Sequence, residues 1–258
     1  MIKFNLLKND IQSINWEIYF YIQFFRKNMT NRKFVIFGQG RTGSFLVRTL
    51  LNCHPQIVCQ GEIFSRYYLK VFMPKFFLQG ITKSFSDKVY GFDLQPNHLT
   101  FHQIKGKLFL SYLHDNGWKI IYLKRKNLFH QKISAIIAIQ QNKWHYWKND
   151  TKISNFTKIY LDSNEIIKEL ENKRLDYIKE QEMLESLPYL EITYEDDLST
   201  VAQHQATANK IFAYLNLPSV LVKTNLQKEP YKISEIIANY EQLYDLLSQT
   251  QYAAFLEE

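Results

Sequence analysis

The sequence predicts an α/β fold of three layers, in which a mostly parallel sheet carries helices on both faces. Short and almost wholly apolar runs, such as FVIF (34–37), VYGFDL (89–94) and KIIYLK (119–124), alternate with longer stretches of helical character. Apolar runs of this length are typical of strands that are buried on both faces, as in a parallel sheet. Parallel strands need crossover connections, and these place helices on the two faces.

Five strands and five helices are expected along the chain. The strands span 34–37, 57–60, 89–94, 119–124 and 190–194. The helices span 44–52, 99–115, 127–147, 163–186 and 199–215. The first helix is apolar on nearly every side, as a buried helix is, and His54-Pro55 ends it. The segment 218–258 is expected to be partly irregular and to close with a helix at ISEIIANYEQLYDLL (233–247).

The length of 258 residues suits one large core. We expect residues 33–258 to form a single α/β domain and residues 1–32 to form an N-terminal helical extension. Within the extension, WEIYFYIQFFRK (16–27) is dense in aromatic residues and ends in basic ones. Two interpretations stay open for this stretch: a helix that packs on the domain, or an interfacial helix that touches a membrane.

The net charge of +7 favours an anionic partner, which could be a small ligand, nucleic acid or an acidic membrane surface. We expect a small anionic ligand and no nucleic acid. No apolar run has the length of a transmembrane helix, and the N-terminus lacks the pattern of a secretory signal. Cys53 and Cys59 are expected to be free thiols, so a cytoplasmic protein, at most peripheral to a membrane, is predicted. The histidines have no metal-ligand spacing, and no metal is expected.

The turn after the first strand, GQGRTGSF (38–45), fits more than one kind of anion-binding loop. Gly38, Gly40 and Gly43 have the G-x-G-x-x-G spacing of dinucleotide-binding proteins. Gly38, Gly43 and Ser44 have the spacing of a nucleoside-triphosphatase P-loop that lacks its lysine. The same turn also contains the R-[ST]-G-[ST] pattern of a loop that holds a sulfate donor. In all of them backbone N–H groups and a helix N-terminus face an anion, so the glycines do not decide between them.

Neighbouring residues separate these interpretations. The triphosphatase interpretation fails because no residue replaces the lysine that should reach the terminal phosphates. An NAD(P)-binding oxidoreductase that uses GQGRTG remains an alternative, because Glu62 follows the second strand, where an acid would hold the ribose hydroxyls. Against it, Arg41 places a fixed cation inside the turn, where it suits a bidentate grip on a compact tetrahedral anion.

A second basic cluster follows the fourth strand, which ends in Lys124-Arg125-Lys126. Asn127 is expected to cap the next helix, and Ser134 lies two turns further along the same helical face. Arg125 and Ser134 could therefore bracket a second phosphate. An oxidoreductase has no need of this cluster, whereas a nucleotide with phosphates at both its 5′ and 3′ positions does.

With these motifs in this order, the chain resembles sulfotransferases that use 3′-phosphoadenosine 5′-phosphosulfate, and among them the bacterial and Golgi carbohydrate sulfotransferases. The segment RTGSFLVRTLLNCHPQIVCQGEIF (41–64) is similar to their 5′-phosphosulfate loop, buried helix and following acid. The segment IIYLKRKNLFHQKIS (120–134) is similar to their 3′-phosphate segment, and VYGFDL and ITYEDDL (192–198) resemble two further segments. The resemblance covers most of the chain from about residue 33 onward and implies a P-loop NTPase-like sulfotransferase fold.

The resemblance also implies residue roles. The 5′-phosphosulfate would be held by Gly40, Arg41, Thr42, Gly43, Ser44 and Phe45. Arg125 and Ser134 would hold the 3′-phosphate, and Lys228 would reach the donor from the C-terminal region. Arg41 would stabilise charge on the leaving oxygen, and Glu62 would be the base that activates the acceptor hydroxyl, with His54 as a rival base.

The resemblance departs from the family pattern at two positions and leaves the acceptor open. Phe45 stands where many members have a second hydroxyl residue, and Asp93 stands where relatives often have lysine. The aromatic residues Trp144, Tyr146 and Trp147 could stack on a sugar ring or fill a core. We expect a carbohydrate or glycolipid acceptor from the resemblance alone, and keep a non-enzymatic anion- or membrane-binding protein as a further alternative.

Overall fold

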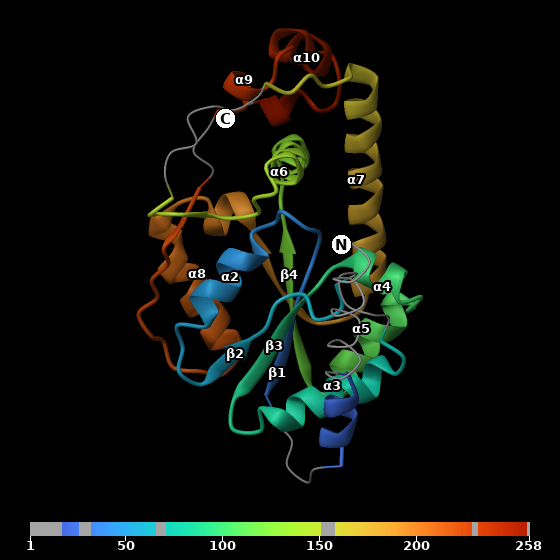
Figure 1. The fold of residues 1–258 in the computed structure, drawn as a ribbon, viewed down its shortest axis with the longest axis vertical. Coiled ribbons are helices and arrows are strands. Elements are labelled where there is room, and N and C mark those ends of the chain that lie inside the picture. The colour runs from blue at the N-terminus through green and yellow to red at the C-terminus, as the bar shows by residue number, and fades with distance from the viewer. Residues whose placement is uncertain (1–16, 26–31, 66–70, 151–157, 229–231, 257–258) are drawn as a thin grey trace, which may run out of the picture. The chain divides into compact units, whose positions relative to one another are not determined.

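The computed structural model describes residues 17–25, 32–65, 71–150, 158–228 and 232–256 (Figure 1). The chain divides into two compact units. The first unit takes residues 1–124 and 182–223 and holds the parallel sheet, and the second takes residues 125–181 and 224–258 and is mostly helical. The single domain expected over 33–258 stays a prediction.

The first unit is built on a sheet of five parallel strands in the order β2-β3-β1-β4-β6. The strands are β1 (Lys33–Phe37), β2 (Ile57–Cys59), β3 (Val89–Leu94), β4 (Trp118–Lys124) and β6 (Tyr189–Thr193). Each begins and ends within one residue of its expected position. Every residue of β1 and β3 is buried, which explains why these runs are apolar on both faces.

Helices cover both faces of this sheet, so the three-layer α/β fold is confirmed (Figure 1). One face carries α2 (Ser44–Leu51) and α8 (Val201–Tyr214). The other carries α3 (Pro74–Ser84), α4 (Pro96–Phe101) and α5 (Gly106–Asp115), and the short helix formed by residues 17–23 lies against α3.

The two faces of the sheet have different cores. Under α2 and α8 the core is mainly aliphatic, and it includes Leu50 of α2, Ile211 of α8 and Ile121 of β4. The opposite face is aromatic. There the rings of Phe92 and Trp118 meet edge to face with their centroids 5.3 Å apart.

The second unit packs helices around its own apolar core. Its elements are α6 (Leu128–Gln140), α7 (Ser163–Leu184, whose last residues belong to the first unit), α9 (Ile233–Ile236), α10 (Tyr240–Ser248) and a 3₁₀ turn (Ala253–Leu256). Two short strands, β5 (Tyr146–Trp147) and β7 (Leu226–Gln227), pair antiparallel.

Three expected helices differ from the structure. The helix expected over 99–115 is two helices, α4 and α5, because Gln103 takes a left-handed φ of 57° between them. The helix expected over 127–147 ends at Gln140, since Tyr146 and Trp147 form a strand with β7. The helix expected over 233–247 is interrupted at Asn239. The Asn239 side chain accepts from the backbone N–H of Leu161 and donates to the Leu161 carbonyl oxygen.

Two smaller expectations can be checked directly. Cys53 and Cys59 are both free thiols, as expected. Among the helices in the described part of the chain, none is long and apolar enough to cross a membrane.

Gly38 follows β1 where the backbone runs close to β4. A Cβ atom at Gly38 would lie 2.1 Å from the carbonyl oxygen of Leu123, a backbone atom that cannot move aside alone. Gly38→Ala is therefore expected to lower the free energy of unfolding by about 3 kcal/mol or more, measured by urea denaturation.

Gly117 provides the matched control. It has a left-handed φ of 78°, but a Cβ there would meet nothing within 4 Å. Gly117→Ala should cost only about 1 kcal/mol for its backbone conformation. Equal losses in the two variants would show that the approach of β1 to β4 is not tight.

Candidate functional site

The turn between β1 and α2 has an unusual backbone. Arg41 has a left-handed φ of 65° and Gly43 has a φ of 93°. The left-handed conformation costs a residue with a side chain about 1–2 kcal/mol, so the surrounding structure must hold Arg41 there. Thr42 is buried, and its hydroxyl donates to the Gln39 carbonyl at 2.8 Å. The Thr42 side chain therefore shapes the turn itself.

The N-terminus of α2 follows directly. Gly43 offers no side-chain cap and the first turn contains no acidic residue. The first N–H groups of a helix lack intrahelical acceptors and carry a partial positive charge. Ser44 begins the helix and lines a small hollow, together with Ile36, Gly38, Thr42, Asp93, Leu94, Gln95 and Leu123. The turn thus joins an uncapped helix end to a hollow at the carboxyl end of the sheet.

Glu62 follows β2 and is held by two residues that follow β3. Its Oε1 accepts a hydrogen bond from Gln95 Nε2 at 2.6 Å, and its Oε2 lies 3.4 Å from His98 Nε2. Gln95 also reaches the loop, because a Cβ atom at Gly40 would lie 3.3 Å from its Oε1. Gln95 therefore connects the predicted base to the glycine turn after β1.

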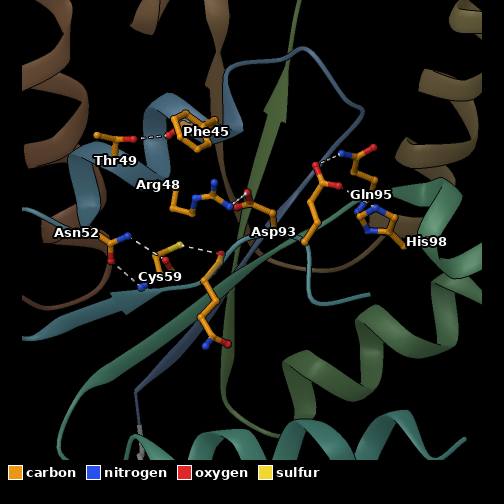
Figure 2. A network of polar contacts seen from close by, with 10 residues as sticks. Phe45, Arg48, Thr49, Asn52, Cys59, Asp93, Gln95 and His98 are labelled. Atoms are coloured by element: carbon orange, nitrogen blue, oxygen red, sulfur yellow. Dashed lines mark hydrogen bonds and ion pairs between the residues drawn. The ribbon is translucent and has the colours of Figure 1, made fainter. Parts of the chain in front are cut away.

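The state of His98 follows from its partners (Figure 2). The backbone N–H of Gln95 donates to His98 Nδ1 at 3.1 Å, so in the neutral ring the proton is on Nε2 and points to Glu62. The hydrogen bond from His98 lowers the pKa of Glu62 below its ordinary value of 4.5, although partial burial acts in the opposite direction. Glu62 is thus ionised at neutral pH while its side chain stays 38% exposed.

A second carboxyl group, Asp93, lies at the end of β3 and faces Arg48 of α2 (Figure 2). Arg48 Nη1 is 3.4 Å from Asp93 Oδ2, and the Asp93 side chain is 4% exposed. Burial raises the pKa of Asp93 to about 7, which Arg48 partly opposes and Glu62 reinforces. Asp93 therefore titrates near neutrality.

Arg48 is fixed on two further sides. Its guanidinium carbon lies 4.6 Å from the centre of the Phe45 ring. Its Nη1 fills the space beside Gly61, where a Cβ atom would lie only 1.9 Å away. Phe45, the departure noted in the sequence, thus packs on the arginine that pairs with Asp93.

The residues predicted for a second anion site lie in the second unit. Asn127 caps α6 as expected, because its Oδ1 accepts from the backbone N–H of His130 at 2.8 Å. The backbone N–H of Arg125 donates to the Tyr177 hydroxyl at 3.0 Å. Ser134 is 3% exposed within α6, and Lys228 is exposed directly after β7.

The structure separates the candidate acceptor aromatics into core and surface. Tyr146 is buried, and its hydroxyl donates to Gln141 Oε1 at 2.6 Å. Trp144 and Trp147 are 43% and 41% exposed. Only the two tryptophans therefore present rings to a ligand.

His54 does not fit the role of a base. The ring is 2% exposed and lies against Phe212. Its Nε2 is 3.2 Å from the Pro218 carbonyl oxygen, and its Nδ1 accepts from the backbone N–H of Gln56. Both nitrogens are engaged inside the protein, so His54 ends α2 and anchors the chain.

Sequence reasoning missed Arg48, Gln95 and His98. Arg48 is four residues after Ser44, which places the two on one face of α2, so helical spacing could have found it. Gln95 and His98 follow β3, whose carboxyl end lies next to that of β1. Only the strand order reveals this neighbourhood.

The strand order also bears on the dinucleotide alternative. In the dinucleotide-binding sheet the second strand lies next to the first, so its terminal acid reaches the ribose. Here β3 separates β2 from β1. The position of Glu62 therefore does not support the oxidoreductase interpretation. Within the described residues no group of three or more His, Cys, Asp or Glu side chains could hold a metal ion.

Comparisons with known proteins give a likeness to solved structures but none to family models or curated sequences. No family model matches the chain, and no curated protein matches it in sequence. Among solved structures, the chain is similar to the crystal structure of a sulfotransferase from Alicyclobacillus acidocaldarius, with a TM-score of 0.49 and 13% identity. The match covers 84% of this chain and 94% of that one. Values this low assign neither a family nor residue roles.

The buried carboxyl of Asp93 should make stability depend on pH. Its folded-state pKa of about 7 lies above the ordinary value of 3.8, so between these values the folded state binds the proton more strongly. Stability is therefore lost as pH rises through this window. Between pH 5 and pH 8 the wild type should lose about 2–3 kcal/mol in free energy of unfolding through Asp93. Asp93→Asn should not show this loss, so the difference between variant and wild type should shift by that amount in favour of the variant. Parallel urea-denaturation curves for the two proteins across this range would contradict the assignment.

The contact from His98 should set the ionisation of Glu62. In His98→Phe the donor is lost, so the pKa of Glu62 is expected to rise, as followed by carboxyl-carbon NMR titration. Glu185, whose pKa is lowered by Lys107, serves as the internal control and should not change. An unchanged Glu62 titration in a folded variant would mean that His98 does not hold the carboxylate.

Proposed function

We propose that this protein transfers a sulfuryl group from 3′-phosphoadenosine 5′-phosphosulfate to an acceptor hydroxyl. The observation that carries the proposal is the turn after β1. It combines Arg41 in a left-handed conformation with an uncapped, acid-free N-terminus of α2. Backbone N–H groups and a guanidinium at one helix end suit a phosphosulfate, which presents oxygens on two tetrahedral centres.

Assignment to this donor rather than to a nucleoside triphosphate rests on charge and residue type. No lysine follows Gly43, where a triphosphatase has its phosphate-binding lysine, so Arg41 is the cation within the turn itself. The basic segment that starts at Arg125, with Ser134 in the following helix, supports a separate 3′-phosphate subsite in the second unit. We assign Lys228 to the donor as well, since it is an exposed cation directly after β7.

In the proposed reaction the acceptor oxygen forms a bond to sulfur while the bond from sulfur to the bridging oxygen of the donor breaks. The bridging oxygen keeps the electron pair, and 3′,5′-adenosine bisphosphate leaves. Such a displacement is in line at a tetrahedral centre, so the protein mainly positions the groups and stabilises charge. Arg41, the N–H groups from Gly40 to Phe45 and the Ser44 hydroxyl would take the charge that grows on the leaving side.

Glu62 would accept the proton of the acceptor hydroxyl. It is ionised because of His98, partly exposed, and fixed through both carboxylate oxygens. A carboxylate of low basicity suits a proton that leaves late, after the attacking oxygen has become acidic through bonding to sulfur. Gln95 and His98 act as positioning residues, because they touch Glu62 and not the reacting atoms.

The acceptor class is proposed to be a carbohydrate or glycolipid. The exposed rings of Trp144 and Trp147 support it, since apolar sugar faces stack on aromatic side chains. Because either tryptophan could also contact an apolar part of another acceptor, the acceptor class is tested by a direct assay of sulfuryl transfer to glycans.

Donor binding is tested by thermal shift with 3′,5′-adenosine bisphosphate, with 5′-AMP, ATP and NAD as comparison ligands. We expect the bisphosphate alone to raise the melting temperature strongly, because a ligand at 100 times its Kd adds about 2.7 kcal/mol. Arg41→Ala and Arg125→Ala should each weaken binding about tenfold or more, whereas Arg174→Ala, at an exposed arginine paired with Glu171, should not.

The base is separated from the donor site in the same experiment. Glu62→Gln should keep the thermal shift with the bisphosphate. The rate at which the sulfuryl group of radiolabelled donor is transferred to water or to a glycan should fall at least about a hundredfold. Stabilisation by NAD or ATP instead of the bisphosphate would overturn the proposed function. Loss of the shift in Glu62→Gln would remove Glu62 from the role of base.

A further inference from the structure

A cluster of exposed apolar side chains lies on the first unit. Its members come from residues 18–25, on and just after the N-terminal helix, and from residues 72–76, at the start of α3. We call this cluster the apolar patch. Its members, each between 46% and 89% exposed, are Ile18, Tyr19, Ile22, Phe25, Phe72, Met73 and Phe76. Single exposed apolar residues are normal, but seven in two short adjoining segments mark an interaction surface.

The helix that carries half of the patch is firmly seated. Phe20 is buried and its ring meets that of Phe77 with centroids 5.6 Å apart. The backbone is close as well, because a Cβ atom at Gly80 would lie 1.8 Å from the Phe20 carbonyl oxygen. The inner side of the helix therefore packs on α3, whereas Ile22 and Phe25 are exposed.

The other half of the patch is held by hydrogen bonds. The backbone N–H of Phe72 donates to Glu17 Oε1 at 2.9 Å, and the backbone N–H of Met73 donates to the Tyr21 hydroxyl at 3.0 Å. These bonds fix the backbone while the Phe72 side chain stays 89% exposed. The exposure of Phe72 is thus built into the fold.

The two segments that carry the patch have a net positive charge. In the described segments 17–25 and 71–85 the only acid is Glu17, which is already bonded to Phe72, whereas Lys75 and Lys83 are basic. Lys75 is exposed and lies between Pro74 and Phe76. Arg26 and Lys27 follow in the sequence, outside the described residues.

We propose that the apolar patch docks the protein on a lipid bilayer that contains anionic lipids. Large aromatic and aliphatic side chains insert into the interface between headgroups and acyl chains, and neighbouring lysines contact anionic headgroups. A second copy of the chain fits less well, because a two-fold contact would bring Lys75 and its symmetry mate to the same surface without a free acid. The proposal is independent of the sulfuryl-transfer chemistry.

The test is co-sedimentation of the full chain with vesicles of phosphatidylcholine alone and of phosphatidylcholine with 30% phosphatidylglycerol. We expect binding to the anionic vesicles and a weaker partition at high salt. The double substitution Phe25→Ser and Phe72→Ser should reduce the partition at least about tenfold, and Lys75→Glu should reduce it by a similar factor at low salt.

The matched control is Val201→Ser with Leu221→Ser, which removes two apolar side chains of 78% and 73% exposure far from these segments in the sequence. It should bind as the wild type does. Absence of wild-type binding, or an equal loss in the control, would overturn the proposal. A wild-type dimer in light scattering that the patch substitutions dissociate, without vesicle binding, would instead make the patch a contact between copies. If the double variant Phe25→Ser and Phe72→Ser does not fold, the vesicle binding of Lys75→Glu tests the proposal by itself.

Discussion

The double pairing of β1 is the constraint on which the candidate site depends. β1 lies between β3 and β4, in register so that Phe37 is opposite Leu94 on one side and Tyr122 on the other. The three strands therefore end side by side, and the segments that follow them are neighbours. Because Gly38 has no side chain, β1 can turn against the carbonyl of Leu123 and deliver the Gly40–Phe45 loop beside the residues that follow β3.

Two carboxyl groups in this region are driven in opposite directions by their surroundings. Asp93 is enclosed, and its burial outweighs the attraction of Arg48, so its pKa rises to about 7. Glu62 is partly open to solvent and accepts from His98 and Gln95, so its pKa falls. An acid that titrates near neutrality next to one that stays ionised is a common arrangement of proton-transfer sites, and here each shift has a named cause.

The proposed chemistry and the proposed membrane contact use different parts of the first unit. The glycine turn and Glu62 follow the carboxyl ends of β1 and β2, whereas the apolar patch belongs to the N-terminal helix and the start of α3. A surface-bound enzyme of this kind would meet acceptors carried by the membrane, which agrees with the glycolipid class among the proposed acceptors. The two proposals nevertheless fail separately, since one is measured with a nucleotide and the other with vesicles.

The sequence by itself determined the α/β class, all five strands of the sheet, the glycine turn with Arg41 and the cap at Asn127, because buried strands and helix starts have local signatures. It did not determine where expected helices break, since Gln103 and the β5–β7 pairing are tertiary choices. It also missed the partners of the two carboxyl groups. Arg48 lies 45 residues from Asp93 in the sequence, and Gln95 and His98 lie 33 and 36 residues from Glu62. The sheet brings these pairs together. Only the order β2-β3-β1-β4-β6 places them, because that order decides which strand ends are neighbours.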